Sequence, residues 1–227
     1  MKMYPAHDAQ PMENAADGTD VAVICDVTAF HAEGGGQLGD IGTITAPTGV
    51  IAVNVTKKLP DGAVIMIGSV TEGTVAVGDA VTFAVDKARK MDIARNHTAT
   101  HLLHAALKQV LGAHVNQAGS YVGPDRLRFD FSHFSQVTAE ELKKVETIVN
   151  EQVLAGKAVN IEELPIEEAK KKGATALFGE KIRQYCSRCY RSGLLYGVLR
   201  RSHVSNTAQI GMFKIVSEGS SGAGVRR

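Results

Sequence analysis

The first part of the chain alternates short β-branched stretches with glycine, proline and aspartate, a pattern typical of β-strands joined by tight turns. The predicted strands are residues 21–27, 42–46, 51–57, 63–69 and 80–84. Pro60-Asp61-Gly62 is a predicted turn between two of them, because proline fixes one φ angle and glycine tolerates a positive one. Strands at this spacing predict a small β-barrel over residues 21–88, after a loose polar N-terminus over residues 1–20.

The hydrophobic period changes after Asp86 to the spacing of an α-helix. Apolar and histidine positions within residues 93–111 repeat on one helical face, and Gly112 is placed to end that helix. A second helix is predicted after Thr138, which can cap it. Glu141 lies three residues later and completes a capping box.

The remaining predicted elements follow the first helix. They are strands at residues 127–131, 159–164 and 209–216, a short basic helix at residues 165–173, and a flexible glycine- and serine-rich tail. The second helix is predicted to end near Leu154. The sequence therefore predicts an α+β fold, in which the small N-terminal β-barrel is followed by an α+β domain over residues 89–227.

The composition is that of an ordinary globular protein, since 44% of the 227 residues are hydrophobic and 22% are charged. The longest apolar runs, such as residues 21–25 and 63–67, are far shorter than the roughly 20 residues that cross a bilayer. Residues 1–20 lack the apolar stretch of a secretory signal, so we expect a cytoplasmic location. The net charge of +1 gives no whole-chain signal for nucleic acid.

Two histidines in the first predicted helix form the strongest local motif. His97 and His101 are four residues apart, so both imidazoles lie on one helical face and can reach one metal ion. A pair at this spacing also occurs by chance. It is not the metalloprotease motif, which needs a glutamate where this chain has Thr98. The nearby His104 and His114 are expected to serve packing or the surface.

The C-terminal part of the chain supplies a second motif. Residues 202–207 (SHVSNT) and 210–215 (IGMFKI) follow each other closely near the C-terminus. Together with residues 95–103 (RNHTATHLL), they are similar to the second additional domain shared by alanyl- and threonyl-tRNA synthetases.

Other motifs select the alanyl branch of that resemblance. Residues 28–37 (TAFHAEGGGQ), with Gly39, Asp40 and Gly42, resemble the glycine-rich signature of the alanyl editing region. Residues 115–120 (VNQAGS) and 128–131 (RFDF) also fit. The resemblance covers about residues 21–181 and 202–227, and it is specific because the separated motifs occur in the family's order.

The resemblance implies a zinc-dependent hydrolase that acts on tRNA. In this family the editing region hydrolyses the ester that joins serine, or less often glycine, to the 3′ end of tRNA(Ala). The family's zinc ligands correspond to His97, His101 and His203. A fourth ligand, a cysteine four residues before His203, is expected at Leu199, where the thiolate is missing.

The resemblance also implies a pocket that distinguishes serine from alanine. Such a second site is needed because an apolar alanine pocket rejects serine by only about 100-fold. Thr28 matches the family's hydroxyl-sensing threonine, although an ordinary strand threonine would look the same in the sequence. Gln37 and Gln117 match positions that line the same pocket, and the glycines at 34–36 would let backbone approach the substrate closely.

Residues 182–201 (IRQYCSRCYRSGLLYGVLRR) match nothing in the family, although both flanks match well. An abrupt loss and return of resemblance suggests a displaced reading frame. Synonymous codons can be chosen so that dropping one base after Lys181 yields a segment ending in Phe-Cys-Gly-Gly, with the cysteine at the position of Leu199. The alternative keeps the segment as genuine, and Cys186 and Cys189 then form a Cys-x-x-Cys zinc half-site.

Three forms of this function fit the sequence. The chain is the editing part of a longer synthetase, a free-standing editing protein, or an inactive tRNA-binding module, which Leu199 favours. No ATP-binding signature is recognisable, so we do not expect this chain alone to charge tRNA. In each form, the basic residues 170–172 and 226–227 are expected to contact the acceptor end of tRNA(Ala) through its phosphates.

Overall fold

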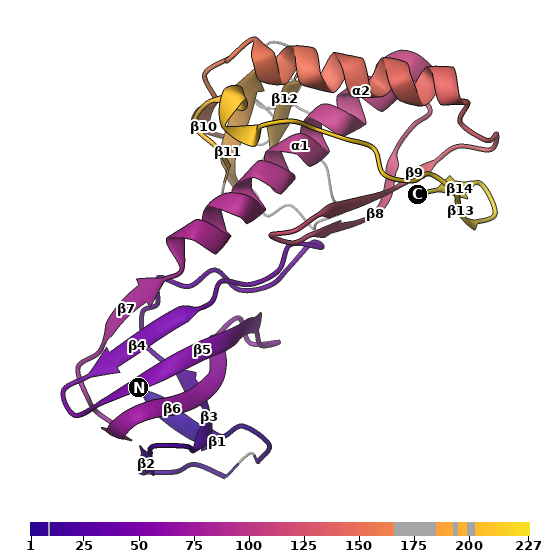
Figure 1. Cartoon of the computed structure of the whole chain (residues 1–227). Coiled ribbons are helices and arrows are strands. Elements are labelled where there is room, and N and C mark those ends of the chain that lie inside the picture. The colour runs from indigo at the N-terminus through magenta and orange to yellow at the C-terminus, as the bar shows by residue number, and fades with distance from the viewer. Residues whose placement is uncertain (9, 166–184, 193–194, 199–202) are drawn as a thin grey trace. The chain divides into compact units, whose positions relative to one another are not determined.

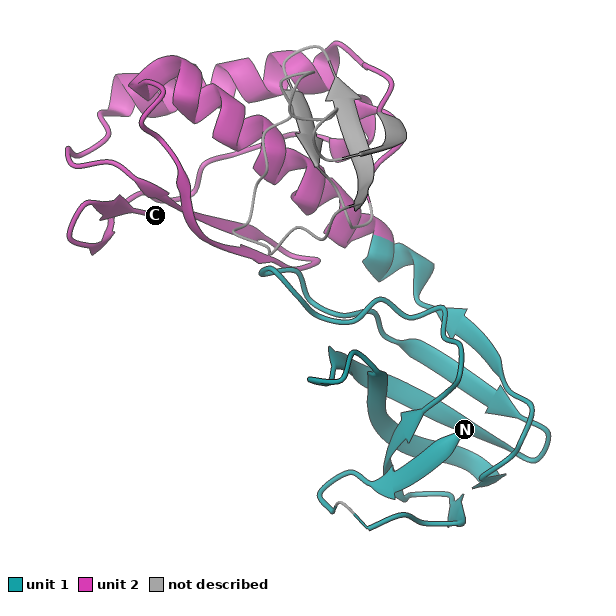
Figure 2. Ribbon diagram, turned by 180° about the vertical axis from the view of Figure 1, so that it is seen from behind, with its two compact units in different colours: residues 1–90 teal, residues 91–227 magenta. Residues whose placement is uncertain are grey.

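The computed structural model describes residues 1–227 except 9, 166–184, 193–194 and 199–202 (Figure 1). Among the described residues, a run of strands precedes the first helix, and further strands and a second helix follow it, so the predicted α+β class is confirmed. The chain divides into two compact units, Met1–Lys90 and Met91–Arg227 (Figure 2).

The first unit is a seven-stranded antiparallel sheet with the order β1-β3-β6-β5-β4-β7, in which β2 also pairs with β6. The strands are β1 Lys2–Pro5, β2 Asn14–Ala16, β3 Asp20–Ile24, β4 Gly42–Ala46, β5 Gly49–Lys58, β6 Val64–Ala76 and β7 Thr82–Val85. Among the described residues, no ladder joins β1 to β7 at the two ends of this path. The structure therefore shows a strongly paired sheet, whereas closure into the predicted barrel is not shown.

The predicted loose N-terminus is wrong for the segments that form β1 and β2. β1 pairs with β3 from Lys2 opposite Ile24 to Pro5 opposite Val21. Met3 is 1% exposed and belongs to the apolar core of the unit. The polar composition of residues 1–20 hides this short apolar anchor, whose burial and ladder bonds offset the entropy cost of ordering the segment.

Two α-helices organise the described part of the second unit: α1 Lys87–Leu111, which begins at the end of the first unit, and α2 Ala139–Leu154. α1 ends at Gly112, whose φ of +113° favours glycine. The predicted capping box of α2 is confirmed, since the Glu141 amide donates to the Thr138 hydroxyl at 3.2 Å and the Thr138 amide donates to the Glu141 carboxylate at 2.8 Å.

Two small sheets complete the described part of the second unit. One has the order β13-β14-β9-β8 and the other the order β10-β11-β12. Their strands are β8 Gln117–Val122, β9 Leu127–Ser132, β10 Asn160–Pro165, β11 Tyr185–Ser192, β12 Leu195–Val198, β13 Ser220–Gly222 and β14 Val225–Arg226. Phe129 and Phe131 of β9 are buried in one core with apolar residues of α1 and α2. This sheet therefore presents one face to the helices.

The segment after His203 differs from the sequence-based prediction of a strand at residues 209–216. It forms a short 3-10 helix, η1 Thr207–Ile210, and then an irregular stretch. Side chains of α2 satisfy the backbone of that stretch: Asn150 donates to the Phe213 carbonyl at 2.9 Å and accepts from its amide at 3.0 Å. The segment thus bonds to a helix instead of a neighbouring strand. The predicted flexible tail that follows contains the β13–β14 hairpin.

The predicted short helix at residues 165–173 lies, except for its first residue, outside the described residues.

Glu146 of α2 supports a stability prediction for this C-terminal segment. Its carboxylate accepts from the Lys214 ammonium and from the Ile215 amide, each at 2.8 Å, and both bonds lower its pKa. A lowered pKa means stabilisation that is present above the ordinary pKa of a glutamate and is lost as the pH falls through the lowered value. Glu146→Gln should therefore cost about 1 kcal/mol at neutral pH, because both bonds are partly exposed to solvent.

Urea unfolding at several pH values checks this prediction, with the exposed Glu151→Gln on the same helix as the matched control. The difference in free energy of unfolding between Glu146→Gln and the parent chain should become smaller in acid. The control should have nearly the same free energy of unfolding as the parent at every pH. A difference in free energy of unfolding that grows as the pH falls would contradict the stabilising role of the Glu146 carboxylate.

Candidate metal centre

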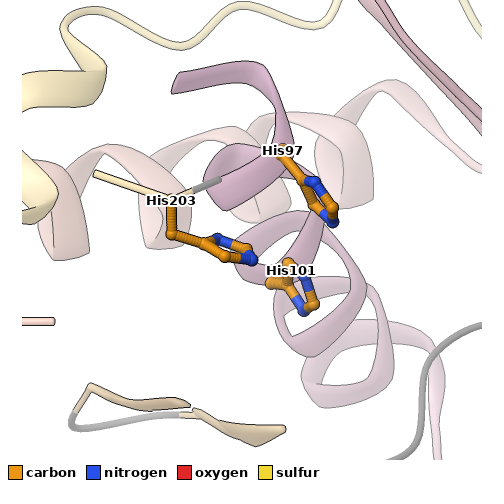
Figure 3. A group of neighbouring side chains, drawn as sticks. All are labelled: His97, His101 and His203. Atoms are coloured by element: carbon orange, nitrogen blue, oxygen red, sulfur yellow. The ribbon is translucent and has the colours of Figure 1, made fainter. Parts of the chain in front are cut away.

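Three histidines converge where α1 passes the segment that precedes η1 (Figure 3). The rings of His97 and His101 stack with centroids 5.2 Å apart, as their spacing on one helical face predicts. The ring of His203 points toward this pair, with centroids 4.5 Å from His97 and 5.1 Å from His101 (Figure 3). One nitrogen atom from each ring lies within 4.8 Å of those of the other two. The structure thus brings together all three histidines that the resemblance selected.

The surrounding chain fixes both halves of this cluster. His97 and His101 are each 1% exposed, because the middle turns of α1 are buried on all sides. Val204, next to His203, is buried against Ala94 and Val159. A backbone bond from the Val159 amide to the Ser205 carbonyl, 2.9 Å long, holds the same segment beside α1. The burial of Val204 therefore positions the imidazole of His203, which comes from a segment outside α1.

The donor set suits a transition metal such as zinc. Neutral imidazole nitrogen is a common zinc ligand, with Zn–N bonds of about 2.0–2.1 Å, and three such nitrogens grouped this closely suit one ion. Three protein ligands are also the usual number in catalytic zinc sites, which keep one position open for a further donor. The cluster is thus compatible with a catalytic type of site even where Leu199 offers no thiolate.

Leu199, the two cysteines of β11 and His104 are the other residues that the sequence suggested or excluded as metal ligands. Leu199, the position of the family's cysteine, lies outside the described residues. For Cys186 and Cys189, only the backbone pairing of β11 with β10 and β12 is described. His104 serves packing, as expected: it is 4% exposed, its Nε2 lies 3.2 Å from the Val115 carbonyl, and burial lowers its pKa.

Gln117 and Ser120 lie on the face of the β8–β9 hairpin that is turned to the helices. Gln117 is opposite Phe131 and Ser120 is opposite Phe129, and cross-strand partners share one face of a sheet. Within the described ranges, the buried Gln117 Oε1 and Ser120 Oγ have no hydrogen-bond partner. Buried polar atoms without partners are costly and commonly mark a site for a ligand or water. In the sequence, Ser120 belongs to a recognisable motif but has no assigned role. Only the structure shows that its hydroxyl is buried, and this burial marks it as a candidate binding residue.

Thr28 belongs to the first unit and lies in a loop after β3, which ends at Ile24. The interpretation as an ordinary strand threonine is therefore wrong. Its hydroxyl donates to the Met66 sulfur at 3.2 Å and accepts from the Phe30 amide at 3.1 Å. A thioether is a weak acceptor, so the proton of this hydroxyl is held only loosely.

Gln37 lies in the same loop and is 1% exposed. Its backbone pairs with Gly34 through two hydrogen bonds of 2.9 and 3.1 Å, which close the glycine-rich stretch into a tight bridge. Asp40 anchors the end of the loop, since its carboxylate accepts from the His31 amide at 2.8 Å and from the Lys90 ammonium at 2.6 Å. Thr28 and Gln37 therefore share one well-anchored loop.

The two ends of the chain match family models of tRNA synthetases. Residues 3–89 match the model of tRNA synthetases class II (A). Residues 202–227 match the model of the threonyl and alanyl tRNA synthetase second additional domain. The fold and the histidine cluster thus belong to a chain related to the class II tRNA synthetases.

Whole-chain relatives narrow this class. The alanine–tRNA ligase of Listeria innocua is 52% identical over 229 residues, covering 99% of this chain and 26% of the relative. The enzymes of the same name from Acetivibrio thermocellus and Geobacillus kaustophilus are each 49% identical, over 99% and 97% of this chain and 26% and 25% of their own lengths. The chain belongs to the alanyl-tRNA synthetase family and spans about a quarter of the length of these relatives.

None of the helices in the described part of the chain has the length and apolar character that crossing a membrane requires.

Gly39 supports a prediction about the loop that carries Thr28 and Gln37. A Cβ atom added at Gly39 would lie 2.3 Å from the backbone carbonyl oxygen of Thr56, which cannot move aside as a side chain could. Gly39→Ala should therefore destabilise the fold by about 1–3 kcal/mol, as overpacking does. Gly219→Ala is the matched control, because a Cβ atom there meets nothing within 4 Å.

Urea unfolding of both variants checks this prediction. Equal stability of Gly39→Ala and Gly219→Ala would contradict the close approach of the loop to β5.

Proposed function

We propose that this chain is the editing portion of an alanyl-tRNA synthetase, which hydrolyses the ester joining serine, or less often glycine, to the 3′ end of tRNA(Ala). The observation that carries the proposal is the convergence of His97, His101 and His203 in a chain of this family. The match of residues 202–227 to the second additional domain supports it, since His203 lies inside that match.

The chemical need for such a site follows from the size of the amino acids. A pocket built for alanine cannot strongly exclude serine, which adds only one hydroxyl, and the discrimination reaches about 100-fold. A second pocket that hydrogen-bonds the hydroxyl selects in the opposite sense, because alanine leaves its polar groups unpaired. The weakly held hydroxyl of Thr28 suits this role, since it can exchange the Met66 sulfur for a substrate hydroxyl.

The histidines would hold zinc, which when bound polarises the ester carbonyl toward attack by water. Gln117 and Ser120 offer buried polar atoms without a partner among the described residues, and these suit binding of the aminoacyl ester. Gln37, in the glycine-rich loop of the first unit, is a further proposed substrate-binding residue. No side chain is assigned as general base.

Two arginines at the C-terminus contribute less to tRNA binding than their sequence suggests. Arg226 forms two hydrogen bonds to Glu218, at 2.5 and 2.8 Å, and Arg227 forms two to Asp130, at 2.7 and 3.2 Å. Their charges are thus already paired within the chain. Phosphate contacts from Arg227, whose side chain is about half exposed, remain part of the proposal, and residues 170–172 lie outside the described residues.

A second candidate is an inactive tRNA-binding module, which Leu199 in place of the family's cysteine favours. The three-imidazole donor set favours an active site, because zinc functions with three histidine ligands in other hydrolytic and hydrating enzymes. Membership of a longer synthetase, ligase activity in its other domains and a cytoplasmic location belong to the same proposal.

Hydrolysis assays on tRNA(Ala) charged with serine or with alanine test the proposal. The chain should release serine much faster than alanine, lose activity on chelation and recover it when zinc is restored. Losing a residue that hydrogen-bonds to a metal ligand typically reduces activity roughly 10–100-fold. His203→Ala removes a proposed ligand itself, so it should reduce the hydrolysis rate by more than that. The exposed His114→Ala is the matched control and should leave the rate unchanged.

Hydrolysis that resists the chelator would overturn the metal-dependent mechanism. Binding of tRNA(Ala) without any hydrolysis would instead identify the inactive module.

A further inference from the structure

Thr98 lies between the two helix histidines in the sequence and is 0% exposed. Its hydroxyl oxygen is 2.8 Å from the Ala94 carbonyl, 3.1 Å from the Nδ1 atom of His203 and 3.3 Å from the Val204 amide. One side chain of α1 thus contacts both the backbone of its own helix and the segment that carries the third histidine, 105 residues away.

The number of protons in these contacts fixes their direction. A threonine hydroxyl has one proton to donate and two lone pairs to accept with. The Ala94 carbonyl can only accept, so it takes the hydroxyl proton, and the Val204 amide can only donate. The remaining lone pair faces His203 Nδ1, which must then carry a proton. The opposite tautomer would leave two oxygen lone pairs facing each other 2.8 Å apart, between Thr98 and Ala94.

We propose that Thr98 is a positioning residue that holds His203 as its Nδ1–H tautomer, so that Nε2 is the nitrogen presented to the metal. This inference rests on the metal centre of the proposed function. Histidine ligands almost always donate their second ring N–H to a carboxylate, a carbonyl or water, and this partner sets the tautomer and ring orientation. Here the acceptor is a neutral hydroxyl supplied by the helix that also carries His97 and His101.

The same hydroxyl ties together the two halves of the centre. Its bond to the Ala94 carbonyl, four residues earlier, fixes the side-chain rotamer of a β-branched residue. Its bond from the Val204 amide fixes the backbone next to His203. Thr98 therefore orients the ring of His203 in two ways, through the backbone of the neighbouring Val204 and through the Nδ1 atom of the ring.

Thr100 provides a control on the same helix. It is also 0% exposed, and its hydroxyl donates to the Asn96 carbonyl at 2.8 Å, again four residues earlier. The structure gives Thr100 no hydrogen bond to His203 among the described contacts. Thr100→Val thus removes a buried hydroxyl with the same helical bond and leaves the third histidine untouched.

The experiment compares Thr98→Val, Thr98→Ser and Thr100→Val with the parent chain. Zinc affinity is measured by competition with a chelator, and thermal unfolding in excess chelator checks the fold of each metal-free variant. Thr98→Val should bind zinc about 10–100-fold more weakly. Thr98→Ser should restore most of the affinity because it keeps the hydroxyl, and Thr100→Val should bind like the parent chain.

The tautomer itself provides a readout that does not depend on any variant. Imidazole nitrogen NMR of the metal-free parent chain should show His203 protonated at Nδ1, and Thr98→Val should lose this preference while Thr100→Val keeps it. His203 protonated at Nε2 in the parent chain would overturn the inference.

The two proposals fail in different ways. Zinc bound equally by Thr98→Val and the parent chain would overturn the role of Thr98 and leave the metal centre intact. A parent chain that binds no zinc would overturn the metal centre and, with it, the presentation of His203 to a metal.

Discussion

The constraint on which this structure depends is the burial of polar side chains in the middle of α1. Each buried polar group needs a partner, and these partners come from segments distant in the sequence. The half-buried Asn96 donates to the carbonyl of Gly123 at the tip of the β8–β9 hairpin, and the buried Thr98 bonds to the segment of His203. His104 contacts the Val115 carbonyl just before β8. One helix thereby contacts both the hairpin and the C-terminal segment that carries His203.

Local physics made much of this fold predictable. The helical period, Gly112 and the capping box at Thr138 fixed the two helices, because each signal acts within a few residues. The spacing of His97 and His101 likewise placed two candidate ligands on one face. The predicted strand at residues 209–216 was wrong because its backbone partners are side chains of α2, which no periodicity of the segment itself reveals.

The third candidate ligand, His203, and the residue proposed to position it, Thr98, could not be found from local sequence patterns. His203 was predicted by family resemblance, since nothing in its own surroundings marks it as a metal ligand. Thr98 carried no signal, because its contact with His203 joins residues 105 positions apart. The frame slip proposed for residues 182–201 stays a prediction. The match to the second additional domain begins at residue 202, directly after that segment.

X-ray absorption spectroscopy of the zinc-loaded chain would test the three-histidine centre, because it counts and identifies the atoms bound to the metal. We expect stoichiometric zinc with imidazole scattering from three histidines, at about 2.0–2.1 Å, and no sulfur. A sulfur neighbour at about 2.3 Å would contradict the three-histidine centre and show that a cysteine completes it. Zinc bound without imidazole scattering would remove the basis for a metal site at His97, His101 and His203.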